Sequence, residues 1–103
     1  MKRVVVTGMS AITALGDDWS TFRSALEKGE NAVQVMEQWQ QLDGLNTCLA
    51  APVTHFEKPG HYKRKMIRSM GRVSLMATRA TELALEQAQL LNHEALTDGS
   101  TGV

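Results

Sequence analysis

The stretch VVVTGMSAITALGDD, residues 4–18, constrains the fold more than any other part of the chain. Three consecutive valines favour extended structure, and a continuous apolar run suits a strand that is covered on both faces. We therefore expect a buried strand over residues 2–7. Two glycines bracket the turn that follows, and Asp17 or Asp18 is a good N-cap for a helix. The stretch predicts a strand, a turn and a helix, which is the start of an α/β fold.

The turn does not match a phosphate-binding loop. A dinucleotide fingerprint needs the pattern G-x-G-x-x-G, whereas Gly8 is followed by Met9 and Ser10 and the next glycine is Gly16. A P-loop would need glycine where this chain has Thr13. The aspartates at the start of the helix would also repel a phosphate. We expect the glycines to serve tight turns and close contact between strand and helix instead.

The spacing of apolar residues divides the rest of the chain. The first helix is expected to stop at Gly29, a residue suited to the position after a helix. Residues 30–46 are polar and predict a loop or short irregular helix, and residues 47–56 predict a second strand, which Pro52 places at an edge or ends early. A long helix with a buried, alanine-rich stripe is expected over residues 62–91. The expected anchors of the loop are Val33, Val35, Met36 and Trp39.

The resulting element order is β-α-β-α-β, with residues 100–103 as the beginning of a last strand. The length of 103 residues suits one domain, and 43% hydrophobic and 21% charged residues are ordinary for an α/β protein. A natural domain rarely ends one residue into a core strand, so we expect residues 1–103 to be part of an incomplete domain.

Composition also bounds the location of the protein. No apolar run approaches the roughly 18 residues that a membrane span needs. The opening apolar run is too short for the core of a signal peptide, so a cytoplasmic location is expected. The single cysteine excludes an internal disulfide and fits a reducing compartment.

Basic residues gather in one window of a chain whose formal net charge is +0. Seven of the eleven Lys and Arg residues fall between positions 58 and 79, and all eleven Asp and Glu residues lie outside that window. The seven are Lys58, Lys63, Arg64, Lys65, Arg68, Arg72 and Arg79. On one continuous helix, the last four of these would share a face about 60° wide.

A solvated helix face normally mixes charges of both signs, so an acid-free face predicts docking of an acidic partner. An acidic protein fits better than nucleic acid, because Tyr62 is the only aromatic residue among these bases. Chance clustering, or neutralisation by acids elsewhere in the fold, stays open as the alternative.

The remaining reactive side chains do not have the spacing of a catalytic or metal site. Cys48 lies within the expected second strand with no histidine beside it, so a buried, inert thiol is expected. Glu82 and Glu86 form an i,i+4 pair that is expected on a solvated helix face. Surface or capping roles are expected for the three histidines, which are His55, His61 and His93. The sequence thus predicts no metal, cofactor or catalytic residue, and neither a nucleic-acid nor a membrane partner.

Four segments carry a family resemblance: RVVVTGMSAITALGDD, WSTFRSALEKGENAV, RKMIRSMGRVSLMATRATELALEQAQL and TGV. Taken in this order, they resemble the N-terminal quarter of the type II β-ketoacyl-acyl carrier protein synthases, or 3-oxoacyl-ACP synthases, which are condensing enzymes of the thiolase fold. Three positions depart from the family pattern. Ser10 replaces a usual glycine, Ala14 a common proline, and Ile67 a general aspartate. The first two imply a slightly different turn, and the third a more positive helix.

The resemblance implies a layered αβαβα fold, a homodimer or a heterodimer with a chain-length factor, and an acyltransferase activity. That activity is a decarboxylative Claisen condensation with malonyl-ACP in fatty-acid or polyketide synthesis. The family's catalytic Cys-His-His set belongs further along the chain, and Cys48 does not match the nucleophile's motif. The resemblance also implies a docking surface for acyl carrier protein, formed here by Arg64, Lys65 and Arg68 with Lys63 and Arg72 as neighbours.

Two alternatives remain open from the sequence. A chain-length factor, the catalytically inactive partner of a polyketide synthase, shares this N-terminal pattern and differs at the nucleophile position. A stand-alone module that binds an acidic protein partner is the other.

Overall fold

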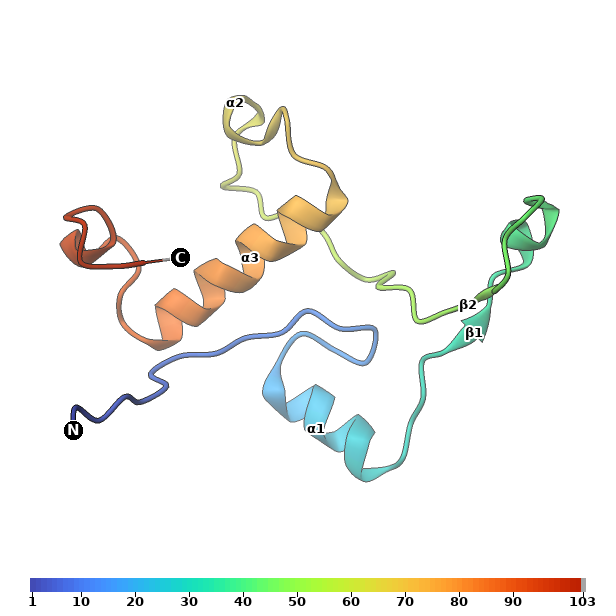
Figure 1. Ribbon diagram of the computed structural model, residues 1–103, viewed down its shortest axis with the longest axis horizontal. Helices are drawn as coiled ribbons and strands as arrows, with labels where there is room; N and C mark the ends of the chain where they lie inside the picture. Colours follow the sequence, from blue (N-terminus) through green and yellow to red (C-terminus); the bar gives the residue numbers. More distant parts are fainter. Residues whose placement is uncertain (103) are drawn as a thin grey trace. The chain divides into compact units, whose positions relative to one another are not determined.

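The computed structural model describes residues 1–102, and the chain divides into two units. One unit joins residues 1–11 to the chain from Glu57 onward, and the other is Ile12–Phe56. The second unit contains α1 (Trp19–Glu27), β1 (Gln34–Val35), η1 (Glu37–Gln41) and β2 (Leu49–Ala50) (Figure 1). The first contains α2 (Arg64–Ile67), α3 (Arg72–Gln87) and η2 (Glu94–Leu96). Within the described residues, no helix combines the length and the apolar character that crossing a membrane requires.

Both ends of α1 lie where the sequence predicts them. The Asp18 carboxylate caps the helix by accepting a hydrogen bond of 2.9 Å from the Thr21 amide. After the helix, Gly29 adopts a φ of 69°, and the Glu30 amide donates to the Ala25 carbonyl at 2.9 Å. This left-handed glycine stop satisfies carbonyls that the last turn would otherwise leave unpaired. The predicted first helix and its stop are confirmed.

The buried strand expected over residues 2–7 is absent from this structure. Val4 is 92% exposed and Val6 is 76% exposed. A strand requires a neighbouring strand to satisfy its backbone groups, and residues 1–102 supply none for this segment. The apolar run is extended but unpaired, so this prediction is wrong for the described residues.

Residues 8–10 instead lie along α3. The Met9 amide donates to the Gln87 side-chain oxygen at 2.7 Å, and the Ser10 hydroxyl donates to the Ala80 carbonyl. A Cβ added to Gly8 would lie 2.2 Å from the Ala84 carbonyl oxygen, so only glycine fits there without a shift. The expected close contact at a glycine is confirmed. Helix α3 here contacts an extended segment, whereas the sequence predicted that a helix would contact a strand. Ser10, one of the three departures from the pattern that the sequence resembles, donates a hydrogen bond to the helix.

The second predicted strand is much shorter than residues 47–56. Only β2 is present, paired antiparallel with β1 so that Gln34 faces Ala50. The Met36 amide extends the pairing by donating to the Cys48 carbonyl at 2.7 Å. No third strand joins this pair within residues 1–102, which leaves it little apolar surface to bury. Of the four expected anchors, Met36 and Trp39 are half-buried, whereas the other two, Val33 and Val35, are exposed.

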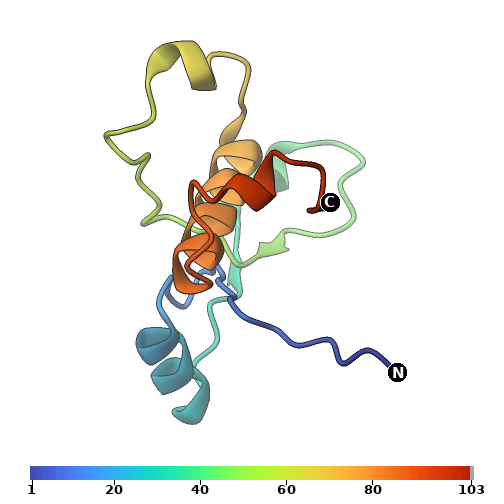
Figure 2. The same cartoon turned by 90° about the vertical axis from the view of Figure 1, so that its left-hand side faces the viewer.

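The single long helix expected over residues 62–91 is also wrong. Gly71 interrupts it with a φ of −78° and a ψ of 175°, and separates α2 from α3. Glycine has a low helix propensity, and here it forms the N-cap of α3. The helix then ends at Gln87, with Gln89 in the left-handed region at a φ of 60°. In two views α2 stands off from α3, joined to it by the intervening loop (Figures 1 and 2).

Among the described residues from 94 to 102 there is a short helix, η2, and no strand. Residues 100–102 are irregular, and Val103, the last residue of the expected strand, lies outside the described residues.

Candidate partner-docking site

The predicted docking side chains lie on α2 and the segments that flank it. Lys63 is the N-cap residue of α2 and Arg68 its C-cap residue, while Arg72 begins α3. All five side chains are exposed: Lys63, Arg64, Lys65, Arg68 and Arg72. The break at Gly71 means that they do not share one continuous helical face, which corrects the face expected from the sequence.

Acids do not neutralise most of this patch. The ion pairs found in residues 1–102 involve none of Lys63, Arg64, Lys65 and Arg68. Arg79 differs, because its guanidinium is 2.7 Å from the Glu82 carboxylate and its side chain is only 29% exposed. Neutralisation by an acid outside the basic window is therefore real for Arg79, and we define the docking segment as residues 63–72 without it.

Glu82 is the residue that sequence reasoning misplaced. Its side chain is 16% exposed, not solvated as expected, and both carboxylate oxygens are occupied. Oε1 accepts from His61 Nε2, while Oε2 accepts from the Tyr62 hydroxyl at 2.9 Å and from Arg79 Nη1 at 2.7 Å. Glu86, one turn later, is exposed as predicted. Helical spacing alone treats the two glutamates alike, because two of the three partners of Glu82, His61 and Tyr62, lie 21 and 20 positions away in the sequence.

Tyr62 is almost completely buried beside this carboxylate, at 6% exposure. The His61 ring meets it edge-on, with ring centroids 4.8 Å apart and planes at 83°. Burial, aided by the hydrogen bond to Glu82, raises the pKa of Tyr62 to about 12. Burial also acts to raise the pKa of Glu82, but hydrogen bonds from Arg79, Tyr62 and His61 outweigh it and lower that pKa below its usual 4.5. At neutral pH the cluster therefore holds an ionised glutamate and a neutral tyrosine.

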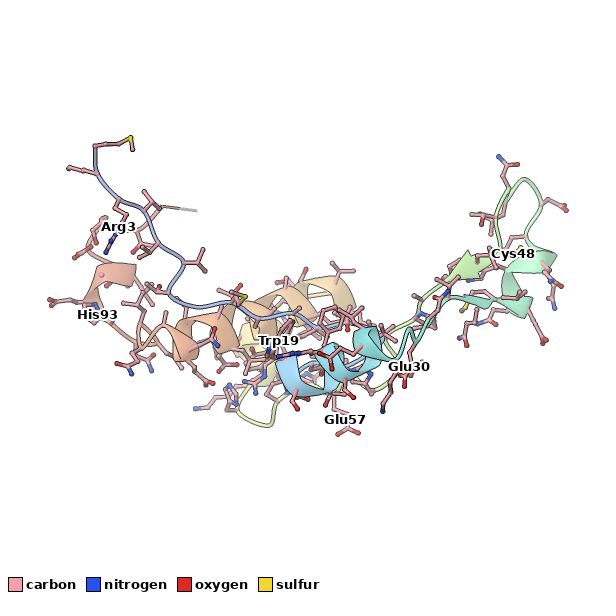
Figure 3. The ribbon with its side chains drawn as sticks, turned by 90° about the horizontal axis from the view of Figure 1, so that it is seen from below. Arg3, Trp19, Glu30, Cys48, Glu57 and His93 are labelled. Carbon is pink, nitrogen blue, oxygen red and sulfur yellow. The ribbon has the colours of Figure 1, made fainter. Side chains whose placement is uncertain are left out.

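The other reactive side chains take part in local contacts. Cys48 is half-buried beside β2 rather than fully buried, and it lies away from α1 in the same unit (Figure 3). His93 confirms its expected capping role, because its Nδ1 accepts from the Ala95 amide at 3.1 Å. His55 lies 2.7 Å from the Asp17 carboxylate. Within the described part of the chain, no group of three or more His, Cys, Asp or Glu side chains could hold a metal ion.

The turn before α1 has the wrong chemistry for a phosphate. An open hollow of about 380 Å³ lies there, and the carboxylates of Asp17 and Asp18 line it together with His55. The Asp18 carboxylate already accepts the Thr21 amide, a donor that an anion at the helix start would need. That hydrogen bond also lowers the pKa of Asp18. Gly16, at a φ of 140°, serves the tight turn, as predicted.

Comparison with known proteins places this geometry in a family. The chain matches the family described as "Beta-ketoacyl synthase, N-terminal domain" over residues 1–103. Nodulation protein E of Rhizobium meliloti (strain 1021) is 34% identical over 103 residues, covering 97% of this chain and 25% of that protein. The 3-oxoacyl-[acyl-carrier-protein] synthase 2 of Staphylococcus aureus (strain COL) is 31% identical over 97 residues, covering 94% of this chain and 23% of that protein.

A solved structure agrees with these relatives. The crystal structure of a β-ketoacyl synthase from Burkholderia phymatum STM815 matches with a TM-score of 0.86 and 49% identity, over 96% of this chain and 24% of that chain. The α/β fold class, as the beginning of a thiolase-like fold, is thereby confirmed. The chain spans about a quarter of the length of the curated relatives that it matches. Since its residues 1–103 match the N-terminal domain of the β-ketoacyl synthases, the chain belongs to the β-ketoacyl synthase family.

Proposed function

We propose that this chain acts as the N-terminal part of a 3-oxoacyl-ACP synthase, which condenses an acyl chain with malonyl-ACP by decarboxylation. This proposal requires a protein of about the length of the relatives, and we call that protein the complete synthase. Its catalytic Cys-His-His set lies beyond these residues, and so do the strands that would pair with residues 2–7. A dimeric state, a cytoplasmic location, and a role in fatty-acid or polyketide synthesis are parts of the same proposal.

The docking segment is the contribution of these residues to substrate recognition. It carries five exposed basic side chains, Lys63, Arg64, Lys65, Arg68 and Arg72, and no acid. This is the observation on which the proposal depends. A cationic surface on a chain of zero net charge favours an acidic partner by local attraction, which speeds encounter and fixes orientation. Relatives of this chain are named for the acyl carrier protein, so we assign that protein as the partner.

Charge reversal in the complete synthase tests the proposal. Lys63→Glu, Arg64→Glu and Lys65→Glu together are expected to raise the KM for acyl-ACP by about tenfold or more, because three attractive contacts become repulsive. The KM for the same acyl group as a pantetheine thioester should stay unchanged. Lys28→Glu, an exposed charge at the end of α1, is the matched control. An unchanged KM for acyl-ACP in the triple variant would contradict the docking role.

The same assay separates a synthase from a chain-length factor. A protein that binds acyl-ACP through this segment and yet catalyses no condensation would be the inactive partner rather than the enzyme. Raised salt should weaken docking in either case, since exposed charges are screened over about 8 Å at physiological ionic strength.

A further inference from the structure

The docking segment has little local support of its own. α2 contains only four residues, and the Lys63 side chain does not cap it. A helix of one turn is not stable by itself in water, because nucleation costs more than one turn returns. The placement of α2 must therefore come from the residues that lead into it and from the helix that follows.

The residues that lead into α2 are fixed on α3. Tyr62 directly precedes Lys63, and its buried hydroxyl donates to Glu82. His61 contacts the second oxygen of the same carboxylate, and the Tyr62 amide closes a turn by donating to the Pro59 carbonyl at 3.1 Å. These contacts hold the chain at the position immediately before the first docking lysine.

Glu82 can hold three partners because it is ionised and mostly buried. An ionised carboxylate offers acceptor sites on both oxygens, and hydrogen bonds to it are roughly twice as strong as neutral ones. Arg79, one turn earlier on α3, orients the carboxylate from within the helix. The charged and titratable side chains around it are Arg79, His61, Tyr62 and, one turn further, Glu86.

From this arrangement we propose that Glu82 is a positioning residue for carrier-protein docking: through Tyr62 and His61 it sets where residues 63–68 stand. The proposal rests on the docking function above. Glu82 itself does not contact the partner. It raises the fraction of molecules in which the basic side chains are already arranged, and apparent affinity scales with that fraction.

The test compares Glu82→Ala with Glu86→Ala in the complete synthase. Both remove a glutamate from the same helix, but only the first removes the contacts to His61, Tyr62 and Arg79. Glu82→Ala is expected to raise the KM for acyl-ACP about tenfold. A rise of that size corresponds to residues 63–68 being correctly placed in about one molecule in ten. The kcat, and the KM for the acyl-pantetheine thioester, should not change. Glu86→Ala should leave all three values at those of the wild type.

Two further variants keep the proposal testable if Glu82→Ala folds poorly. Glu82→Gln retains one acceptor oxygen and should give an intermediate KM for acyl-ACP. Tyr62→Phe removes one hydroxyl and keeps the buried ring, so it should raise that KM slightly. Added to Glu82→Ala, it should have almost no further effect, because both changes break the same contact.

Each outcome decides between the two proposals. A raised KM for acyl-ACP in the charge-reversal protein but not in the Glu82 variants would overturn the positioning role and leave docking intact. An unchanged KM in both would overturn docking, and positioning with it. Equal rises for acyl-ACP and acyl-pantetheine in Glu82→Gln would overturn the positioning role in favour of a general structural one.

Discussion

Helix α1 and helix α2 are specified by different kinds of interaction. α1 has its start and stop in its own sequence: Asp18 caps one end and Gly29 ends the other. α2 has neither a side-chain cap nor a glycine stop, and its approach is fixed by a hydrogen bond between Tyr62 and Glu82, 20 residues apart. Local chemistry specifies the first helix, whereas tertiary contact specifies the second.

The difference bears on function because the candidate docking side chains lie on the second kind of segment. A locally specified helix keeps its shape when distant residues change. A segment held by a few tertiary contacts can be released without unfolding the protein, since regions with few buried contacts open at low free-energy cost. Changes near α1 should therefore alter stability, and changes at Glu82 should alter docking.

The largest effect on stability is expected at Gly8. Residues 8–10, like the approach to α2, are held by contacts to α3. Gly8→Ala places a Cβ 2.2 Å from the Ala84 carbonyl oxygen, and such overpacking costs about 1–3 kcal/mol. The urea midpoint of the complete synthase should fall accordingly. Gly60→Ala is the control, because no atom lies within 4 Å of its added Cβ. Equal midpoints for the two variants would mean that the segment does not pack closely on α3.

A smaller effect on stability is expected at Gly29, which ends the locally specified helix α1. Alanine at a φ of 69° costs about 1–2 kcal/mol, because its Cβ approaches the following carbonyl oxygen. Thermal unfolding should show the loss, and Gly29→Asn should show less of it, since asparagine tolerates the left-handed region. The KM for acyl-ACP should not change in either variant. A raised KM would contradict the separation of α1 from docking.

The pH dependence of the Glu82 contacts sharpens the comparison further. The pKa of Glu82 is lowered in the folded protein relative to its usual 4.5. Its stabilising contribution is therefore complete above about pH 4.5 and is lost as the pH falls through the folded pKa. The difference in unfolding free energy between wild type and Glu82→Gln, measured from pH 7 downward, should be constant to about pH 4.5 and then shrink. A difference that grows in acid would reverse the assigned sign.

The smallest effect is expected at the N-cap of α1. Asp18→Ala removes the acceptor of the Thr21 amide, so amide hydrogen exchange at Thr21 should accelerate while the rest of the helix changes little. Asp18→Asn keeps an acceptor at the same position and should protect that amide nearly as well. If Asp18→Ala and wild type exchange at the same rate, the cap contributes nothing to α1.

Much of the candidate site was predictable from sequence, but its support was not. The five docking residues follow from an acid-free run of bases and a family resemblance, and the structure leaves all five exposed. Their proposed role in docking is tested by the KM for acyl-ACP and not by their exposure. No sequence pattern indicates the role of Glu82, because a pair of glutamates at i,i+4 has the same spacing whether one of them is buried or both are solvated.

The sequence by itself determined what depends on neighbours within one turn: the cap at Asp18, the stop at Gly29 and the tight turn at Gly16. Tertiary structure decided what depends on distant partners. The valines of residues 2–7 cannot form a strand without a neighbouring strand, and the burial of Glu82 depends on His61 and Tyr62, which come from an earlier segment of the chain. Hydrogen bonds and burial depend on which groups meet in space, and a linear pattern records only how far apart they are along the chain.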